Sequence, residues 1–171
     1  MLTSLTFGEV YHVVCNMREK DAVEIYNLRP HDNELQLAYE AHHLIANSGR
    51  GVCSWHRGKP AAVAAFTESW PGCWEVWMFG TEDFAQAVWP LLKWVRTEAK
   101  SLIDDCGANR LQCDSRADYL ESHKLIQGLG GTQEAYLRRY GKDGSDYIRF
   151  SWINGECDAV LEAGFQTVSV A

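Results

Sequence analysis

The longest helical pattern in this sequence lies between two stretches that resemble β-strands. Its apolar residues recur at spacings of three and four and form a single stripe: Leu91, Leu92, Val95, Ala99, Leu102 and Ile103. A helix with one apolar stripe has to bury that stripe against another layer of structure, and neighbouring strands supply such a layer. The pattern therefore predicts helices packed on a sheet. We expect this helix to begin near Pro90, because proline is tolerated at the first helical position.

The other segments alternate between strand-like and helical patterns. Strand-like runs occur at 9–16, 51–57, 61–69, 73–80, 110–113, 133–140 and 146–152, and helical spacings occur at 21–29, 34–46 and 117–127. Glycine-containing turns at 58–60 and 141–144 predict two hairpins. The predicted order is β-α-α-β-β-β-α-β-α-β-β, which indicates an α+β fold with a mixed α/β sheet. We expect one domain over 1–153 and a tail over 154–171.

Composition excludes several classes of protein. Hydrophobic residues make up 46% of the chain and charged residues 23%, which is typical of a globular domain. Lys and Arg number 16 against 23 Asp and Glu, so the net charge is −7 and a nucleic-acid partner is not expected. No apolar run approaches the roughly 20 residues that cross a bilayer, so no membrane partner is expected. The first 16 residues show no signal-peptide pattern, and the sequence predicts a cytoplasmic protein.

No metal site is expected from the cysteine and histidine spacings. The six cysteines show no two-residue spacing of the kind found in zinc sites, and we expect reduced, mostly buried thiols. His42 and His43 are adjacent, and neighbouring residues on a helix point about 100° apart, so they cannot clamp one ion. Either histidine remains a candidate general base.

The predicted order is similar to that of the GNAT acyltransferases over residues 9 to about 153. The resemblance is most specific in the second half, where RLQCDS is followed by YLESHKLIQGLGG and then by EAYLRRYGKDGSDYIRFSW. Three further features resemble a divergent branch encoded by short-tailed bacteriophages, some of whose members are internal virion or assembly proteins. They are the aromatic strand Cys73–Trp77, the pair Val88-Trp89, and Ser122-His123 before Gly130. This resemblance implies a GNAT-like fold, and a location in the host cytoplasm or the virion.

The resemblance also implies where acetyl-CoA would bind. In GNAT enzymes the pyrophosphate lies on backbone N–H groups at the start of the long helix, where glycines let the chain approach the phosphates. Gln86 matches the first position of the family pattern, but Trp89 and Leu91 stand where small residues belong. Cofactor contacts would come from Gln86 and from one segment of the aromatic strand: Trp77, Met78, Phe79 and Gly80.

Catalytic residues are carried over less completely. The family uses a tyrosine as general acid in the helix before the closing hairpin, and its position here is occupied by Ile126, which cannot donate a proton. Tyr119 lies seven residues earlier, about 10 Å away along a helix, and Tyr136 lies in the next strand. Glu75 on the central strand is the candidate general base. Because about half of strand positions face solvent, Glu75 can equally be an exposed strand carboxylate.

Two functions follow from this pattern as expectations. The first is a GNAT-fold phage protein whose acyl-CoA site has degenerated and which binds other proteins in the virion, during assembly, or in the host. Exposed tryptophans such as Trp70, Trp89 and Trp94 would contact the partner, although half-buried tryptophan is also common in small cores. The alternative is an active acetyl-CoA-dependent N-acetyltransferase with a rearranged cofactor loop at 80–88, Glu75 as base, and Tyr119 or Tyr136 as acid.

Overall fold

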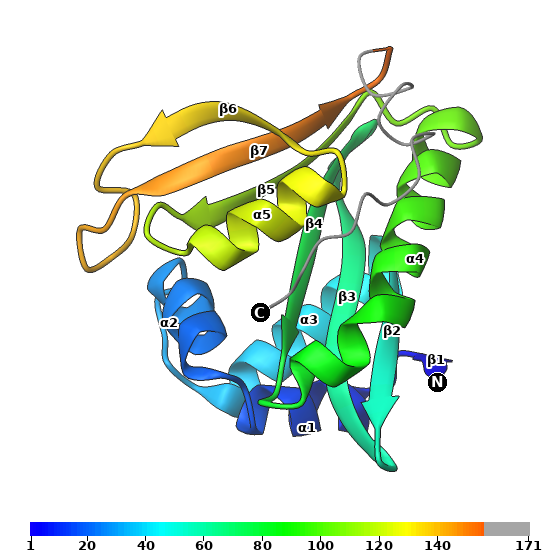
Figure 1. Ribbon diagram of the computed structural model, residues 1–171, viewed down its shortest axis with the longest axis vertical. Helices are drawn as coiled ribbons and strands as arrows, with labels where there is room; N and C mark the ends of the chain where they lie inside the picture. The colour runs from blue at the N-terminus through cyan, green and yellow to red at the C-terminus, as the bar shows by residue number, and fades with distance from the viewer. Residues whose placement is uncertain (156–171) are drawn as a thin grey trace. The chain divides into compact units, whose positions relative to one another are not determined.

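The structure, a computed structural model, describes residues 1–155. Seven strands form one sheet in the order β1-β2-β3-β4-β5-β7-β6 (Figure 1). The strands are β1 (Leu2–Ser4), β2 (Gly49–His56), β3 (Lys59–Trp70), β4 (Cys73–Gly80), β5 (Arg110–Arg116), β6 (Thr132–Leu137) and β7 (Tyr147–Ile153). The helices are α1 (Phe7–Cys15), α2 (Glu19–Asn27), α3 (Glu34–Ser48), α4 (Phe84–Asp104) and α5 (Leu120–Gly128). The predicted α+β class with a mixed sheet is confirmed.

The chain divides into two compact units that are interleaved in sequence. The N-terminal unit comprises Met1–Glu68 and Val76–Val95, and the C-terminal unit comprises Ser69–Glu75 and, among the described residues, 96–155. Strand β4 and helix α4 each contribute residues to both units. Apart from its first two residues, the tail predicted at 154–171 lies outside the described residues.

The N-terminal unit buries both faces of its strands. Antiparallel β1, β2 and β3 are paired so that Cys53 lies opposite Val63 and Ser54 lies opposite Ala62. Residues of α1, α3, β2, β3 and β4 form the core on one face: Val10, Val13, Val14, Leu37, Ala38, Ala41, Cys53, Val63 and Phe79. Because side chains alternate along a strand, Ser54 lies on the other face, where its hydroxyl donates to the Ala87 carbonyl of α4 at 2.7 Å.

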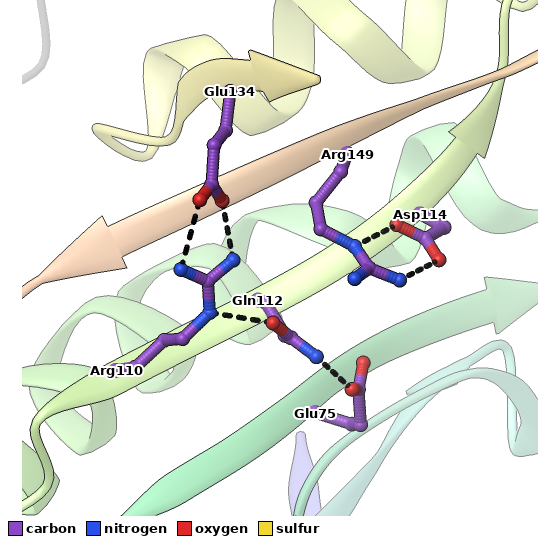
Figure 2. A network of polar contacts seen from close by, with 6 residues as sticks. All are labelled: Glu75, Arg110, Gln112, Asp114, Glu134 and Arg149. Carbon is purple, nitrogen blue, oxygen red and sulfur yellow. Dashed lines mark hydrogen bonds and ion pairs between the residues drawn. The ribbon is translucent and has the colours of Figure 1, made fainter. Parts of the chain in front are cut away.

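The C-terminal unit contains the parallel pairing of the fold. Residues 73–75 of β4 pair in parallel with 110–112 of β5, whereas β5 and β7, and β7 and β6, pair antiparallel. Helix α5 packs on one face of these strands, as Figure 1 shows. The Trp152 indole N–H donates to the Leu129 carbonyl at 3.0 Å, and the His123 and Phe150 rings lie 5.3 Å apart. The opposite face carries Arg110, Gln112 and Asp114 of β5 and Arg149 of β7 (Figure 2).

Two predictions about secondary structure were wrong near the start of the chain. Residues 7–15 form helix α1 and not the predicted strand at 9–16, and the short strand β1 was not predicted. The Thr6 side chain accepts the Glu9 N–H, while the Glu9 carboxylate accepts the Thr6 N–H at 2.7 Å, so a capping box starts the helix. The resulting order has three helices before β2, one more than predicted.

The start of α4 also differs from the prediction. The helix begins at Phe84, so Pro90 lies inside it rather than at its first position. Thr81 supplies the start: its hydroxyl accepts the Asp83 N–H at 3.2 Å, and its carbonyl accepts the Phe84 N–H at 2.9 Å. Pro90 therefore removes one N–H from the helix interior. The other predicted helices and strands are confirmed to within a few residues at each end.

Candidate functional site

The junction between β4 and α4 is where the family resemblance would place phosphate groups. In this chain the amides of Gly80, Thr81, Asp83, Phe84 and Gln86 have internal partners. The Gly80 N–H donates to the Asp21 carboxylate at 2.9 Å, and the Thr81 N–H donates to the Ala61 carbonyl at 2.8 Å. The Gly80 carbonyl accepts the Arg18 N–H at 2.9 Å. These hydrogen bonds connect the start of α2 to the end of β4 within the N-terminal unit.

Asp21 is held at this junction by Arg18. The Arg18 Nε donates to Asp21 Oδ2 at 3.0 Å and Nη2 donates to Oδ1 at 2.8 Å, a two-pronged pairing that fixes both carboxylate oxygens. The guanidinium lies 3.8 Å from the centre of the Phe84 ring, at cation–π distance. Asp21 is only 5% exposed. A buried carboxylate with a charged partner and a backbone donor is a satisfied structural group.

Gly80 is required here by packing. A Cβ at Gly80 would lie 2.5 Å from Cδ2 of Phe84 and 2.8 Å from the Ala61 carbonyl oxygen, closer than atoms can approach. The absent side chain lets β4 pass against β3 and the first residue of α4. The protein's own packing therefore accounts for the glycine.

The first turn of α4 does not fit a pyrophosphate. The Phe84 and Gln86 amides donate to the Thr81 and Asp83 carbonyls, so they are engaged within the turn. Glu82 and Asp83 are exposed, and their charges repel an anion. Acetyl-CoA is the cofactor that the fold family implies, and its phosphates would have to displace internal hydrogen bonds beside several carboxylates.

The residues matched to the family pattern lie within helix α4: Gln86 in its first turn, and Trp89 and Leu91 further along. Gln86 and Trp89 are exposed on the helix, and Leu91 is fully buried in the core. On β4, Trp77 stacks on Phe79 with ring centres 5.6 Å apart, and Phe79 is buried against α1 and α3. Met78 is half-buried. The aromatic part of β4 therefore contributes to the core of the N-terminal unit.

A second polar site lies on the C-terminal unit and contains Glu75. Figure 2 shows side chains from four strands on one face of the sheet: Glu75 of β4; Arg110, Gln112 and Asp114 of β5; Arg149 of β7; and Glu134 of β6. Alternate residues of β5 reach this face because side chains alternate along a strand. The group contains three carboxylates and two guanidinium groups, so one carboxylate is left without a matching cation.

Hydrogen bonds orient Glu75 through a relay. Arg110 binds Glu134, with one N–H···O distance of 3.0 Å, and its Nε donates to the Gln112 side-chain oxygen. This bond fixes which end of the Gln112 amide points to β4, so the Gln112 Nε2 donates to Glu75. Arg149 is occupied by Asp114, with N···O distances of 2.8 and 2.7 Å. The excess carboxylate is therefore Glu75, whose hydrogen-bond partner in Figure 2 is a neutral amide.

The electrostatic setting of Glu75 differs from that of the other carboxylates. Burial raises the pKa of Glu75, and the hydrogen bond from Gln112 only partly offsets this effect. By contrast, the hydrogen bond from Arg110 lowers the pKa of Glu134. A half-buried carboxylate with a raised pKa holds a proton more readily than an exposed one and can accept one from an amine or hydroxyl. Glu75 is thus a candidate acid–base group.

The predicted tyrosine acids lie elsewhere in the C-terminal unit. Tyr119 is the N-cap residue of α5 and is half-buried. Tyr136 is exposed on β6, and its hydroxyl donates to Asp146 at 2.8 Å, a bond that raises the pKa of Tyr136. Ile126, at the position of the family's acid, packs closely against Gly131. The structure joins Glu75 to Gln112 and gives Tyr136 a different carboxylate partner.

The polar residues that sequence reasoning missed had weak signals. Arg18 and Asp21 are three residues apart at the start of a helix, a spacing at which opposite charges meet. Arg110, Gln112 and Asp114 alternate with apolar residues, which predicts one polar face of a strand. Among residues 1–155 no group of three or more His, Cys, Asp or Glu side chains could hold a metal ion. No helix within the same range is both long and apolar enough to span a bilayer.

Comparisons with known proteins identify the fold. No protein-family model matches the sequence, and no curated protein matches it. Among solved structures, a GNAT-family acetyltransferase from Bacillus anthracis is similar with a TM-score of 0.68 and 11% identity, over 91% of this chain and 95% of the other. The chain has the fold of the GNAT acetyltransferases. The GNAT fold predicted from the order of elements is therefore confirmed.

Two other solved structures show the same fold with different named activities. A spermidine N-acetyltransferase from Vibrio cholerae, in complex with CoA and spermine, has a TM-score of 0.66 and 12% identity over 90% of this chain and 95% of the other. A ribosomal-protein-S5-alanine acetyltransferase from Vibrio fischeri has a TM-score of 0.62 and 13% identity over 91% and 93%. At these identities the likeness concerns the fold alone. None of the three structures is named as a bacteriophage protein, and the phage branch stays a prediction.

Proposed function

We propose that this chain uses the GNAT fold as a protein-binding scaffold and has a closed acyl-CoA phosphate site. One observation carries the proposal: the Gly80 amide, at the start of the turn that leads into α4, is bonded to the buried carboxylate of Asp21. An internal carboxylate at this amide satisfies the donor that a phosphate oxygen would otherwise take, and its charge repels a second anion. Opening the site would also leave the Arg18 guanidinium without its partner.

The partner in this proposal is another protein. The net charge of −7 opposes binding to a phosphate backbone, and exposed aromatic side chains are typical anchors of protein interfaces. The phage resemblance extends the proposal to a virion or host component as the partner, encountered in the host cytoplasm or in the assembled particle.

A titration with acetyl-CoA, and separately with CoA, tests the closed site. A ligand at about 100 times its dissociation constant adds about 2.7 kcal/mol of stability, which raises the Tm of a chain of this length by roughly 5–10 °C. We expect flat melting curves up to millimolar ligand. A saturable rise in Tm, matched by heat release in calorimetry, would overturn the proposal.

A second candidate function is an acetyl-CoA-dependent N-acetyltransferase with a rearranged cofactor loop. The half-buried Glu75, whose pKa burial raises, favours it, because such a carboxylate suits removal of a proton from an acceptor amine. The fold neighbours named as a spermidine N-acetyltransferase and a ribosomal-protein-S5-alanine acetyltransferase suggest spermidine and an alanine of a ribosomal protein as amines to test. Release of free CoA thiol that requires both amine and Glu75, and that is lost in Glu75→Gln, would establish this function in place of the first.

A further inference from the structure

Helices α1 and α3 present a group of aromatic rings on their outer side. The Phe7 ring lies at the centre of this group: its centre is 4.7 Å from that of Tyr39, 6.0 Å from that of Tyr11, and 5.8 Å from that of His42. Phe7 and Tyr11 are four residues apart on α1, and Tyr39 and His42 are three apart on α3. Each pair therefore lies on one side of its helix. We call Phe7, Tyr11, Leu35, Tyr39 and His42 the α1/α3 surface.

Phe7 packs against the core, whereas the two tyrosines and the leucine of this surface are exposed. Tyr39 is 60% exposed, Leu35 49% and Tyr11 39%, whereas the residues of the same helices that face the sheet are buried. Exposed tyrosines and leucine grouped on two adjacent helices form an apolar patch with rigid side chains, which is typical of a binding surface. Such aromatic side chains lose little conformational freedom when a partner covers them.

Apart from histidine, the charged side chains of α1 and α3 are all acidic. Neither α1 nor α3 contains a lysine or an arginine, although the chain has 16 of them, and the two helices carry Glu9, Glu34 and Glu40. Glu9 is buried in the α1 capping box, and Glu40 is paired with Arg29 and His31. Glu34 is exposed at the start of α3. Glu34 directly precedes Leu35 on α3 and so lies beside the patch. A hydrogen bond with Cys15 raises the pKa of Tyr11, and the charge of Glu34 adds to this effect.

We propose that the α1/α3 surface binds a short basic and apolar segment of a partner protein. The apolar side chains of the segment would cover Phe7 and Leu35, and its lysine or arginine groups would lie over the exposed tyrosine rings and beside Glu34. This inference rests on the proposed protein-binding function and names the surface that performs it.

Two other occupants fit the charges less well. A second copy of this chain would form a two-fold contact that brings the same lysine-free and arginine-free helices together, with Glu34 facing like charge. An anionic membrane would meet the same repulsion, since its headgroups attract basic residues. Both remain outcomes that the experiment can report, and each would contradict the proposal.

The test measures binding of a labelled amphipathic peptide of leucine and lysine to the full chain by fluorescence anisotropy. The control peptide has glutamate in place of lysine. We expect binding of the lysine peptide only. The double variant Tyr11→Ser/Tyr39→Ser should weaken binding at least about tenfold, because exposed aromatic anchors dominate interfaces of this kind. The double variant keeps the net charge, so the loss cannot come from long-range attraction to an acidic protein.

Matched variants separate the surface from general effects. Leu120→Ser removes an apolar side chain that is 61% exposed on α5, and it should leave the affinity unchanged. Glu34→Gln should weaken binding a few-fold and reduce its dependence on salt. Circular dichroism and Tm establish that each variant is folded. The proposal is overturned if the wild type does not bind the peptide, if Leu120→Ser weakens binding as much as the tyrosine variant, or if both peptides bind equally.

Two further measurements distinguish this proposal from others. If light scattering shows that the wild type is a dimer and that Tyr11→Ser/Tyr39→Ser is a monomer, the surface binds a second copy of the chain. If the wild type binds anionic vesicles and the double variant does not, the surface binds a membrane. The acetyl-CoA titration is independent of the tyrosines. Binding of acetyl-CoA would contradict the proposed closed site without affecting the peptide result. Failure of the peptide to bind would contradict only the proposal about the α1/α3 surface.

Discussion

Replacement of Asp21 by alanine should cause a large loss of stability, and the structure indicates how large. Asp21→Ala leaves the Gly80 N–H without its acceptor, and an unsatisfied buried donor costs about 1–3 kcal/mol. Arg18 also loses its partner, but its side chain is partly exposed and can turn to water, which adds about 1 kcal/mol or less. We expect a total loss of about 1–4 kcal/mol, or roughly 2–15 °C in Tm.

The matched variant is Asp21→Asn, and the measurement is urea unfolding followed by tryptophan fluorescence. Asparagine has the same size and keeps a side-chain oxygen that accepts the Gly80 N–H, but it loses the charge attraction to Arg18 and one of the two oxygens that accept from the guanidinium. Asp21→Asn should therefore lose about 1 kcal/mol, less than the loss for alanine. Equal losses in the two variants would refute a contribution from the hydrogen bond between Gly80 and Asp21.

Three further outcomes are expected. Ser54→Ala should lose about 1 kcal/mol in urea unfolding, because its buried hydroxyl donates to the Ala87 carbonyl, and an unchanged midpoint would contradict this. Burial raises the pKa of Glu75 above its ordinary value of about 4.3, so the native state holds this proton more tightly and the contribution of Glu75 to stability falls as pH rises from about 4. Glu75→Gln should lack this contribution. If the wild type and Glu75→Gln show the same change in unfolding free energy between pH 4 and pH 8, the prediction is contradicted. Burial raises the pKa of the Cys53 thiol to about 12, so at pH 8 iodoacetamide should modify the exposed Cys106 and leave Cys53 intact until the chain unfolds, which peptide mass spectrometry can follow.

Local patterns predicted most of the fold, and competing local patterns explain the errors. The turns at 58–60 and 141–144 and the apolar stripe of α4 act over a few residues, so the sequence contains the whole signal. At 7–15 two signals conflict, because a run of β-branched residues favours a strand while the pair Thr6 and Glu9 caps a helix. The helix forms because Val10, Val13 and Val14 then lie on one buried side. The predicted start of α4 near Pro90 was wrong for a similar reason, because the hydrogen bonds of Thr81 start the helix at Phe84.

The candidate sites were predictable only in part, because their contacts join distant segments. Glu75 could be found as a carboxylate within an apolar strand, and its partner Gln112 lies 37 positions away. The bond between Asp21 and the Gly80 amide spans 59 positions, and no spacing in the sequence indicates it. For the same reason Gly80 resembled a residue that approaches a ligand, whereas its neighbours Phe84 and Ala61 occupy the space in the folded chain.

The interleaving of the two units has a consequence for how the protein can be made and divided. Residues 69–75 leave the ribosome before 76–95, yet residues 73–75 pair with β5, which follows α4 in the chain. The N-terminal unit is therefore complete only after residue 95 has been synthesised. By then the growing chain already includes residues 69–75, which belong to the C-terminal unit. Neither unit is a continuous stretch of sequence, so no single cleavage or stop codon yields one of them intact. A fragment ending at residue 95 would carry residues 73–75 without the β5 strand that pairs with them, leaving an open strand edge that invites aggregation.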